Sequence, residues 1–368
     1  MRAQLTDILS STDIKKVYFR NRLAVAPMTR ISATEAGQAS KAMLDYYARF
    51  AAGGFGLVIT EGLYTDSAFS QGYPFQPGMA SEVQAKGWID ITDAIHRNGA
   101  VVFAQVMHAG ALSQSNRFRA HTVGPSAIQP TGKQMTAYYG EGKYPQPMEI
   151  TEMEIAEVIQ GFVDSAVRAV HVAGFDGIEI HGANGYLLDQ FLSAESNQRK
   201  DKWGGDIHGR VSLTIEVLKA VKAALPKEIP VGVRISQGKV NDFTSKWAGG
   251  EADAAVVFSA LAQAGADFIH VTEFEAWKPA FKNGNASLVE LARKYAPHVA
   301  LIANGGLHDN ERATQVLAQG SDILALGRGA LSNPDLPQML EKQQALRPFD
   351  PSVLSPVANI KDSELSFG

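Results

Sequence analysis

One arginine lies inside an apolar segment, where a charged side chain is costly to bury. Arg234 is part of the run Val231–Ile235, which has the composition of a buried strand. A buried guanidinium without a partner loses several kcal/mol of hydration free energy. We therefore expect Arg234 to face an anion, or a negative charge that develops during a reaction. The alternative is a structural ion pair with a carboxylate such as Glu179 or Asp267.

Two glycine-containing segments in the last third of the chain have the features of a phosphate site. Asn304-Gly305-Gly306 and Gly327-Arg328-Gly329 each follow a short apolar run. Their backbone amides can donate to phosphate oxygens, and Arg328 adds a positive charge. Paired glycines alone are weak evidence, because turns use them constantly. If the runs are the seventh and eighth strands of a barrel, however, barrels commonly bind phosphate at this place.

Polar residues also follow the four apolar runs that precede Arg234. They are Pro27, Met28, Thr29 and Arg30 after the first run, Glu61 and Gly62 after the second, Gln105 and His108 at the third, and His181, Asn184 and Tyr186 at the fourth. If the runs are parallel strands of one barrel, these residues converge on the mouth where barrel active sites form. For His108 we expect a supporting role.

The elements that would position these residues alternate between short apolar runs and longer segments of helical periodicity. This alternation is typical of repeated βα units around a parallel sheet. The expected strands are Leu23–Ala26, Leu57–Thr60, Val101–Val106, Gly177–His181, Val231–Ile235, Phe268–Val271, Ala300–Ala303 and Ile323–Leu326. The expected helices are Lys41–Ala52, Gln84–Arg97, Thr151–Ala173, Arg210–Leu225, Asp253–Ala264, Ser287–Tyr295, Asn310–Gln319 and Pro334–Ala345. The pattern predicts a single-domain α/β protein over residues 1–368, a (β/α)8 TIM barrel.

Two segments fall outside this repeat. Residues 109–150 form a long excursion between the third strand and its helix, which would overhang the mouth as a lid or small subdomain; a surface loop without function is the alternative. Within it, Tyr138, Tyr139 and Tyr144 are candidates for an aromatic roof, or for solvent-facing residues. The C-terminal tail, residues 348–368, is expected either to fray or to dock on a neighbouring subunit.

Composition excludes several classes of function. The formal charge of -4 and the mixed surface segments give no basic stripe for nucleic acid. The absence of cysteine excludes disulfides, thiolate nucleophiles and iron–sulfur clusters, and no metal site is expected. No apolar run approaches the roughly 20 residues of a bilayer span, and Met1–Ser11 does not have the pattern of a signal peptide. We therefore expect a cytoplasmic protein without a membrane partner.

The residues considered so far resemble the old yellow enzyme family of FMN-dependent ene reductases, from about Asn21 to Asp335. The matching segments are Asn21–Arg30, Ile180–Leu188, Asn197–Arg199 with Trp203–Gly205, Ala303–Gly306, and Leu326–Arg328 through Ser332–Asp335. The segment from His181 to Tyr186 is the most specific of them.

The resemblance implies a tightly but non-covalently bound FMN as the cofactor. Pro27, Met28, Thr29, Gly62 and Gln105 would surround the flavin ring, with His181 and Asn304 also in contact with the cofactor, and Gly305, Gly306, Gly327 and Arg328 would take the phosphate. Arg234 would lie along the pyrimidine edge, where it would stabilise the charge that accumulates when the flavin is reduced.

The resemblance also implies a reaction. NAD(P)H would reduce the flavin transiently, and flavin N5 would pass the hydride to the β-carbon of an α,β-unsaturated carbonyl or nitro compound. His181 and Asn184 resemble the family's pair of donors to the substrate oxygen. Tyr186 resembles the acid that protonates the α-carbon, since a phenol with a pKa of about 10 keeps its proton at neutral pH.

Two departures from the family pattern affect these expectations. Thr29 stands where some relatives carry cysteine, so its hydroxyl would be the group that tunes the flavin. Ala111 follows His108-Ala109-Gly110 where many relatives have arginine, which leaves the contacts of that loop open.

Two other functions are alternatives. A dienoyl-CoA-reductase-like enzyme would need an iron–sulfur cluster and further nucleotide domains, against which the lack of cysteine and the length argue. A barrel that holds FMN or a phosphate ester without alkene reduction is the alternative from another class. The expected partners are a small enone or nitro substrate and NAD(P)H, and the formation of a homo-oligomer is left open.

Overall fold

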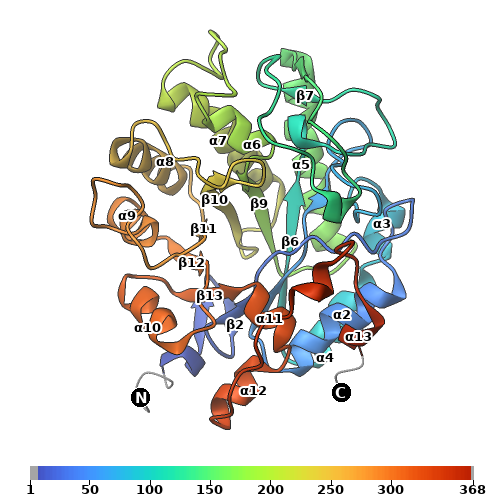
Figure 1. Ribbon diagram of the computed structural model, residues 1–368, viewed down its shortest axis with the longest axis vertical. Helices are drawn as coiled ribbons and strands as arrows, with labels where there is room; N and C mark the ends of the chain where they lie inside the picture. Colours follow the sequence, from blue (N-terminus) through green and yellow to red (C-terminus); the bar gives the residue numbers. More distant parts are fainter. Residues whose placement is uncertain (1–6, 366–368) are drawn as a thin grey trace.

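The computed structural model describes residues 7–365, so the first six residues of the Met1–Ser11 segment and the last three of the tail lie outside it. Its centre is a closed barrel of eight parallel strands (Figure 1). They are β3 (Leu23–Val25), β4 (Leu57–Ile59), β6 (Val101–Met107), β9 (Gly177–Asn184), β10 (Val231–Lys239), β11 (Phe268–Thr272), β12 (Ala300–Asn304) and β13 (Ile323–Leu326). Each strand pairs with the next in chain order, and β13 pairs with β3 to close the barrel. The predicted fold class and all eight strands are confirmed.

Helices form the outer layer of the barrel (Figure 1). They are α2 (Lys41–Ala52), α3 (Glu82–Lys86), α4 (Ile89–Arg97), α5 (Glu152–His171), α7 (Ile207–Ala224), α8 (Glu251–Gln263), α9 (Leu288–Tyr295), α10 (Asn310–Ala318) and α12 (Leu336–Glu341). The helix predicted over Gln84–Arg97 is wrong as one continuous element, because the chain breaks between α3 and α4 at Gly87, a residue of low helix propensity. Three short helices were not predicted: α6 (Leu187–Leu192), α11 (Arg328–Ser332) and α13 (Asp362–Leu365).

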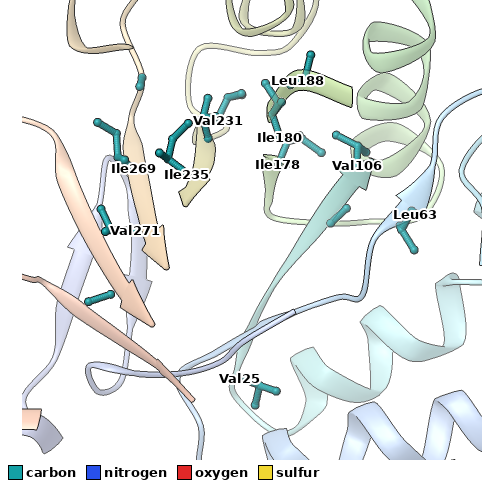
Figure 2. Packing of buried hydrophobic residues seen from close by; sticks show 14 of the residues in the cluster. Val25, Leu63, Val106, Ile178, Ile180, Leu188, Val231, Ile235, Ile269 and Val271 are labelled. Carbon is teal, nitrogen blue, oxygen red and sulfur yellow. The ribbon is translucent and has the colours of Figure 1, made fainter. Parts of the chain in front are cut away.

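Alternation along the strands explains why apolar strands can carry polar site residues. Figure 2 labels outward-facing side chains such as Ile178 and Ile180 of β9 and Ile269 of β11, which belong to the large core between strands and helices. Successive side chains of a strand point to opposite faces. Glu179 lies between Ile178 and Ile180, and His270 follows Ile269. Both side chains are therefore directed into the barrel, where they are fully buried.

A separate apolar cluster fills the N-terminal half of the barrel interior. Phe103 of β6 and Phe268 of β11 stack there with ring centroids 5.4 Å apart. A hairpin formed by β1 (Thr12–Ile14) and β2 (Val17–Phe19) closes this end, and Phe19 packs edge-on against Phe103 at 5.9 Å. Packing thus blocks one end of the barrel and leaves the polar residues at the other.

The excursion, residues 109–150, contains little regular structure: two short helical turns, η1 (Gly110–Leu112) and η2 (Thr136–Tyr138), and two two-residue strands, β7 (Val123–Gly124) and β8 (Met148–Glu149). Buried Arg199, from the loop after α6, donates to the carbonyl oxygens of Pro125 at 3.2 Å and Ile150 at 2.8 Å. One side chain therefore ties together two distant points of the excursion.

The tail packs on its own chain as far as it is described. It contains η3 (Pro351–Leu354) and α13 (Asp362–Leu365), and α13 lies beside α2 (Figure 1). Over residues 7–365, no helix is both long and apolar enough to cross a membrane.

Candidate active site

A cavity of about 530 Å³ opens at the C-terminal ends of the barrel strands. Every site residue predicted from the sequence lines it: Pro27, Met28, Thr29, Gly62, Gln105, His181, Asn184, Tyr186, Arg234, Asn304, Gly305, Gly306, Gly327 and Arg328. The volume is in the range of cofactor and small-molecule sites. The strand ends thus bring together residues that are up to 301 positions apart in sequence, from Pro27 to Arg328.

Arg234 is held in the cavity wall by neutral groups. Its Nη2 donates to Thr272 Oγ1 at 3.2 Å and to Asn304 Oδ1 at 3.1 Å, while its buried Nε has no hydrogen-bond partner among the described residues. Neither carboxylate considered as a structural partner bonds to it: Glu179 bonds elsewhere, and Asp267 pairs with lysines. Burial lowers the pKa of Arg234, but an arginine stays protonated. A buried donor is therefore left for an anionic or electron-rich ligand.

A fully buried carboxylate fixes the orientation of Gln105. The Gln105 Nε2 donates to Glu179 Oε1 at 2.8 Å, and the other oxygen of Glu179 lies 2.7 Å from Nδ1 of His270. Burial acts to raise the pKa of Glu179, but the nearby His270 and Arg234 outweigh it and hold the pKa below its usual value. Because Glu179 stays ionised and takes one N–H of the amide, Gln105 keeps its Oε1 and its second N–H for a ligand.

His181 is placed to act as a neutral hydrogen-bond donor. Burial, reinforced by the positive charge of Arg234, lowers the pKa of His181 well below its ordinary value. Its Nδ1 accepts from the backbone amide of Ala183 at 3.3 Å. In a neutral imidazole the other nitrogen then carries the proton. His181 Nε2 therefore carries the proton and can donate it in a hydrogen bond to a ligand.

Asn184 is directed by an unusual backbone conformation. It has a φ of 61°, and the next residue, Gly185, has a φ of 86°. Asparagine is among the few residues that tolerate this left-handed region. The turn is held by hydrogen bonds from the Asn184 amide to Ser236 Oγ at 2.8 Å and from the Gly185 amide to Asp189 Oδ2 at 2.6 Å. No hydrogen bond within the described chain occupies the Asn184 side chain, so its amide is available to a ligand.

Tyr186 has a partner that sequence analysis missed. Its hydroxyl is hydrogen-bonded to that of Tyr73, and its ring meets His181 edge-on with centroids 4.9 Å apart. Burial raises the pKa of both tyrosines above the ordinary value. Both therefore keep their protons at neutral pH. Tyr73 lies in an irregular loop after β5 (Leu63–Tyr64), and no motif or periodicity distinguishes it in the sequence.

Of the three tyrosines considered as a roof, one lines the cavity. Tyr138 is in the cavity wall, and its ring packs against Tyr73 with centroids 4.9 Å apart. Tyr144 is buried within the excursion, and Tyr139 is 54% exposed. The roof is therefore Tyr138 with the neighbouring Met135, and Tyr139 faces solvent.

The far end of the cavity is shaped for close approach of a ligand to the backbone. Gly305 has a φ of 140°, and a Cβ added there would lie 2.1 Å from the carbonyl oxygen of Glu273. Gly306 has a φ of 69°, so neither position admits another residue without strain. Arg328 lies beside them with its guanidinium 5.3 Å from the ring centroid of Phe274. This end combines free backbone with a positive charge, as a phosphate requires.

Several other residues of the cavity wall were not predicted. They are Val240, Phe243, Glu273, Phe274, Leu331 and Leu354. Leu354 comes from the tail, and Phe243 and Phe274 are exposed aromatic residues on the loops after β10 and β11. Apart from Glu273, which directly follows β11, these residues are apolar, so their place in the wall follows only from the folded chain. His108 is buried away from the cavity, and burial lowers its pKa.

A comparison with protein families gives the wider relationship. The model of the NADH:flavin oxidoreductase / NADH oxidase family matches residues 8–347. The chain belongs to this family. The match covers the barrel from its first strand through α12, so every predicted site residue is part of it.

Individual members of the NADH:flavin oxidoreductase family agree with this placement. The chain is 33% identical over 361 residues to 12-oxophytodienoate reductase 1 of Oryza sativa, covering 94% of this chain and 88% of that protein. It is 32% identical over 341 residues to an NADH oxidase of Thermoanaerobacter brockii, covering 90% of this chain but only half of that longer protein.

Solved structures show the same fold and the same group of enzymes. An old yellow enzyme homologue from Zymomonas mobilis superposes with a TM-score of 0.88 at 28% identity, covering 98% of this chain and 99% of that one. Morphinone reductase in complex with tetrahydroNAD superposes with a TM-score of 0.85 at 26% identity, covering 98% and 97%. The resemblance to the old yellow enzyme family predicted from sequence is confirmed.

FMN is the cofactor of this family, and the cavity of this chain fits it. FMN requires space for a ring system, a buried cation, an oriented amide and a phosphate cradle. The cavity provides the space, and Arg234 with its unpartnered Nε is the buried cation. Gln105 is the oriented amide, and the backbone of Gly305-Gly306 forms the phosphate cradle. Within the described chain, no group of three or more His, Asp or Glu residues is arranged to hold a metal ion.

Proposed function

We propose that the protein is an NAD(P)H-dependent ene reductase that acts on α,β-unsaturated carbonyl or nitro compounds. One observation carries the proposal: neutral His181, Asn184 and Tyr186 line the same cavity as the predicted FMN contacts. Two hydrogen-bond donors and a proton donor are what reduction of a polarised alkene requires. The 12-oxophytodienoate reductase and morphinone reductase relatives are consistent with this chemistry.

We assign the cofactor contacts as follows. Pro27, Met28, Thr29 and Gly62 would hold the ring, and Gln105, Arg234, His181 and Asn304 would contact its polar edge. Gly305, Gly306, Gly327 and Arg328, which line the same cavity, would bind the phosphate. Bound there, FMN would supply the hydride chemistry, which is acceptance of a hydride from NAD(P)H and its transfer to the β-carbon of the alkene. Arg234 stabilises the negative charge of the reduced ring, because its guanidinium is buried and bonded only to neutral groups.

The remaining residues act on the substrate. His181 Nε2 and the Asn184 amide donate to the substrate oxygen, so the charge that develops there during hydride transfer is already held. Tyr186 then gives its hydroxyl proton to the α-carbon, and solvent returns a proton to the phenolate. The hydride and the proton together make up the two hydrogens added across the double bond.

The test separates the two half-reactions. The purified protein should show the visible spectrum of FMN, lose it with NAD(P)H under anaerobic conditions, and recover it with cyclohexenone. Tyr186→Phe should slow recovery about 100-fold or more while the rate of reduction changes little. Tyr139→Phe, in an exposed residue of the excursion, is the matched control. Equal losses in both half-reactions would remove Tyr186 from the role of acid, and an FMN protein that no alkene reoxidises would favour a binding function.

A further inference from the structure

The tail contributes directly to the wall of the active-site cavity. Leu354, at the end of η3, lines the cavity together with Tyr138 and Tyr186. Three residues later, Val357 packs against the cluster that contains Tyr73 and Tyr186. Side chains from the last fifteen described residues therefore lie next to the groups that bind and protonate the substrate.

A buried ion pair holds this part of the tail in place. Arg30 Nη1 donates to Glu364 Oε1 at 2.8 Å, and a second hydrogen bond joins Nη2 to the other carboxylate oxygen. The two side chains are 0% and 2% exposed. Arg49 of α2 also contacts Glu364. Removal of one partner of such a buried bidentate pair strongly destabilises the folded protein, because the other partner is left as an uncompensated buried charge.

Arg30 also binds the tail backbone, which makes the attachment specific in position. Its Nε donates to the carbonyl oxygen of Ala358 at 3.0 Å, and its Nη2 donates to that of Asn359 at 2.9 Å. The amide of Ile360 donates to Ser32 Oγ at 2.8 Å. The guanidinium therefore fixes both ends of the segment from Ala358 to Glu364, and with it the register of the residues that precede it.

The same segment connects two loops of the active site. Arg30 directly follows Thr29, which lines the cavity. On the other side, the amide of Ala358 donates to the carbonyl oxygen of Ala137, the neighbour of Tyr138, at 2.8 Å. The tail thus connects the loop after β3 with the excursion, and its residue Leu354 lines the cavity.

We propose that residues 351–365 form a latch, closed by the Arg30–Glu364 pair, that limits the size of the electron acceptor. Leu354 is the specificity-determining residue and Glu364 is a positioning residue that acts through the tail backbone. The proposal rests on the function proposed above. If the latch only stabilised the fold, its loss would change the activity with all acceptors in the same proportion. If Leu354 limits the size of the cavity, its loss changes the activity with large acceptors more than the activity with small ones.

The first experiment removes most of the Leu354 side chain from the cavity wall. For the FMN-loaded protein, kcat/KM is measured with cyclohexenone and with a fused bicyclic enone, and the ratio of bulky to small acceptor is compared. Leu354→Ala should raise this ratio about tenfold, since a few methyl groups in an apolar pocket change selectivity by that order. Leu346→Ala makes the same change in a half-buried residue outside the cavity wall and should leave the ratio unchanged.

The second experiment opens the latch. Glu364→Gln should also raise the ratio, and Glu364→Asp should restore it in part, because the carboxylate is retained. If Leu354→Ala and Glu364→Gln both have the same ratio of kcat/KM for the bulky and small acceptors as the wild type, the latch proposal is overturned while the proposed function stands. If Glu364→Gln fails to fold, Leu354→Ala decides alone. If the wild type reduces neither acceptor, the proposed function fails first, and the latch with it.

Discussion

The hydroxyl groups of Tyr73 and Tyr186, 113 residues apart in sequence, are hydrogen-bonded to each other beside the cavity that Tyr186 lines. Tyr73 is fully buried, so its hydroxyl has little access to water. If Tyr186 gives its proton to a substrate, Tyr73 must be the donor in this hydrogen bond. It then stabilises the phenolate that Tyr186 becomes, in a place where burial would otherwise make that phenolate costly.

This geometry predicts the effect of Tyr73→Phe. The variant should retain FMN and its reduction by NAD(P)H, while reoxidation by cyclohexenone slows about tenfold, the value of one lost hydrogen bond to a charged group. The loss should be smaller than in Tyr186→Phe, since the proton itself is still present. Stopped-flow absorbance of the two half-reactions measures both rates. Unchanged reoxidation in Tyr73→Phe would mean that the pair has no part in proton transfer.

The lowered pKa of His181 predicts a pH profile. Burial and Arg234 keep the imidazole neutral, so it is a donor of the same charge over the whole range from about pH 6 to pH 8. The rate of reoxidation by an enone should show no inflection from a histidine in that range. His181→Asn, which keeps one donor, should retain more activity than His181→Ala. An inflection near pH 6.5 that His181→Asn removes would contradict a neutral donor.

Glu61 predicts a pH dependence of stability. Burial raises its pKa to about 7, although its carboxylate accepts from the amides of Arg30 at 2.9 Å and Ile31 at 3.2 Å. A raised carboxyl pKa gives stability that is complete below the unfolded value of 4.5 and is lost as pH rises through 7. The difference is about 3 kcal/mol. Relative to Glu61→Gln, the wild type should lose this much free energy of unfolding between about pH 4 and pH 8.

Denaturant titrations of the two proteins at both pH values measure this difference. Comparison with the Gln variant cancels the other titrating groups, because those are common to both proteins. A difference between the two proteins that does not vary with pH would show that the pKa of Glu61 is the same in the folded and unfolded states.

Arg234 predicts a change in the flavin itself. Arg234→Met removes a buried positive charge and leaves the neutral Thr272 and Asn304 in place. Because that charge favours the reduced anionic ring over the oxidised neutral one, the reduction potential of bound FMN should become more negative. Spectroelectrochemistry of wild type and variant measures the shift, with FMN content as the control for binding. An equal or more positive potential would place Arg234 away from the ring.

The chain's own pattern was sufficient for the barrel and for most of the site. Each strand is short and apolar because one face packs on helices and the other fills the barrel, so the eight runs stand out in the sequence. Gln105, His181 and Arg234 are visible because polar residues in or directly after such runs are uncommon. The glycines after β12 and β13 are visible because of their position at the last two strands.

What could not be predicted depends on contacts distant in sequence. Tyr73 becomes part of the site only because its loop folds against Tyr186, and Leu354 only because Arg30 binds Glu364, 334 residues away. Loops and tails without polar motifs therefore complete a site whose centre the strands define.

The most direct test of the proposed chemistry is a single-turnover reoxidation. The protein is reduced anaerobically without excess NAD(P)H and mixed with cyclohexenone, and the return of the FMN absorbance is followed together with formation of cyclohexanone. We predict one saturated ketone for each flavin reoxidised in the wild type, and a rate at least about 100-fold lower in Tyr186→Phe. Flavin that stays reduced with cyclohexenone, a nitroalkene and a maleimide alike, in protein that still accepts electrons from NAD(P)H, would contradict the account.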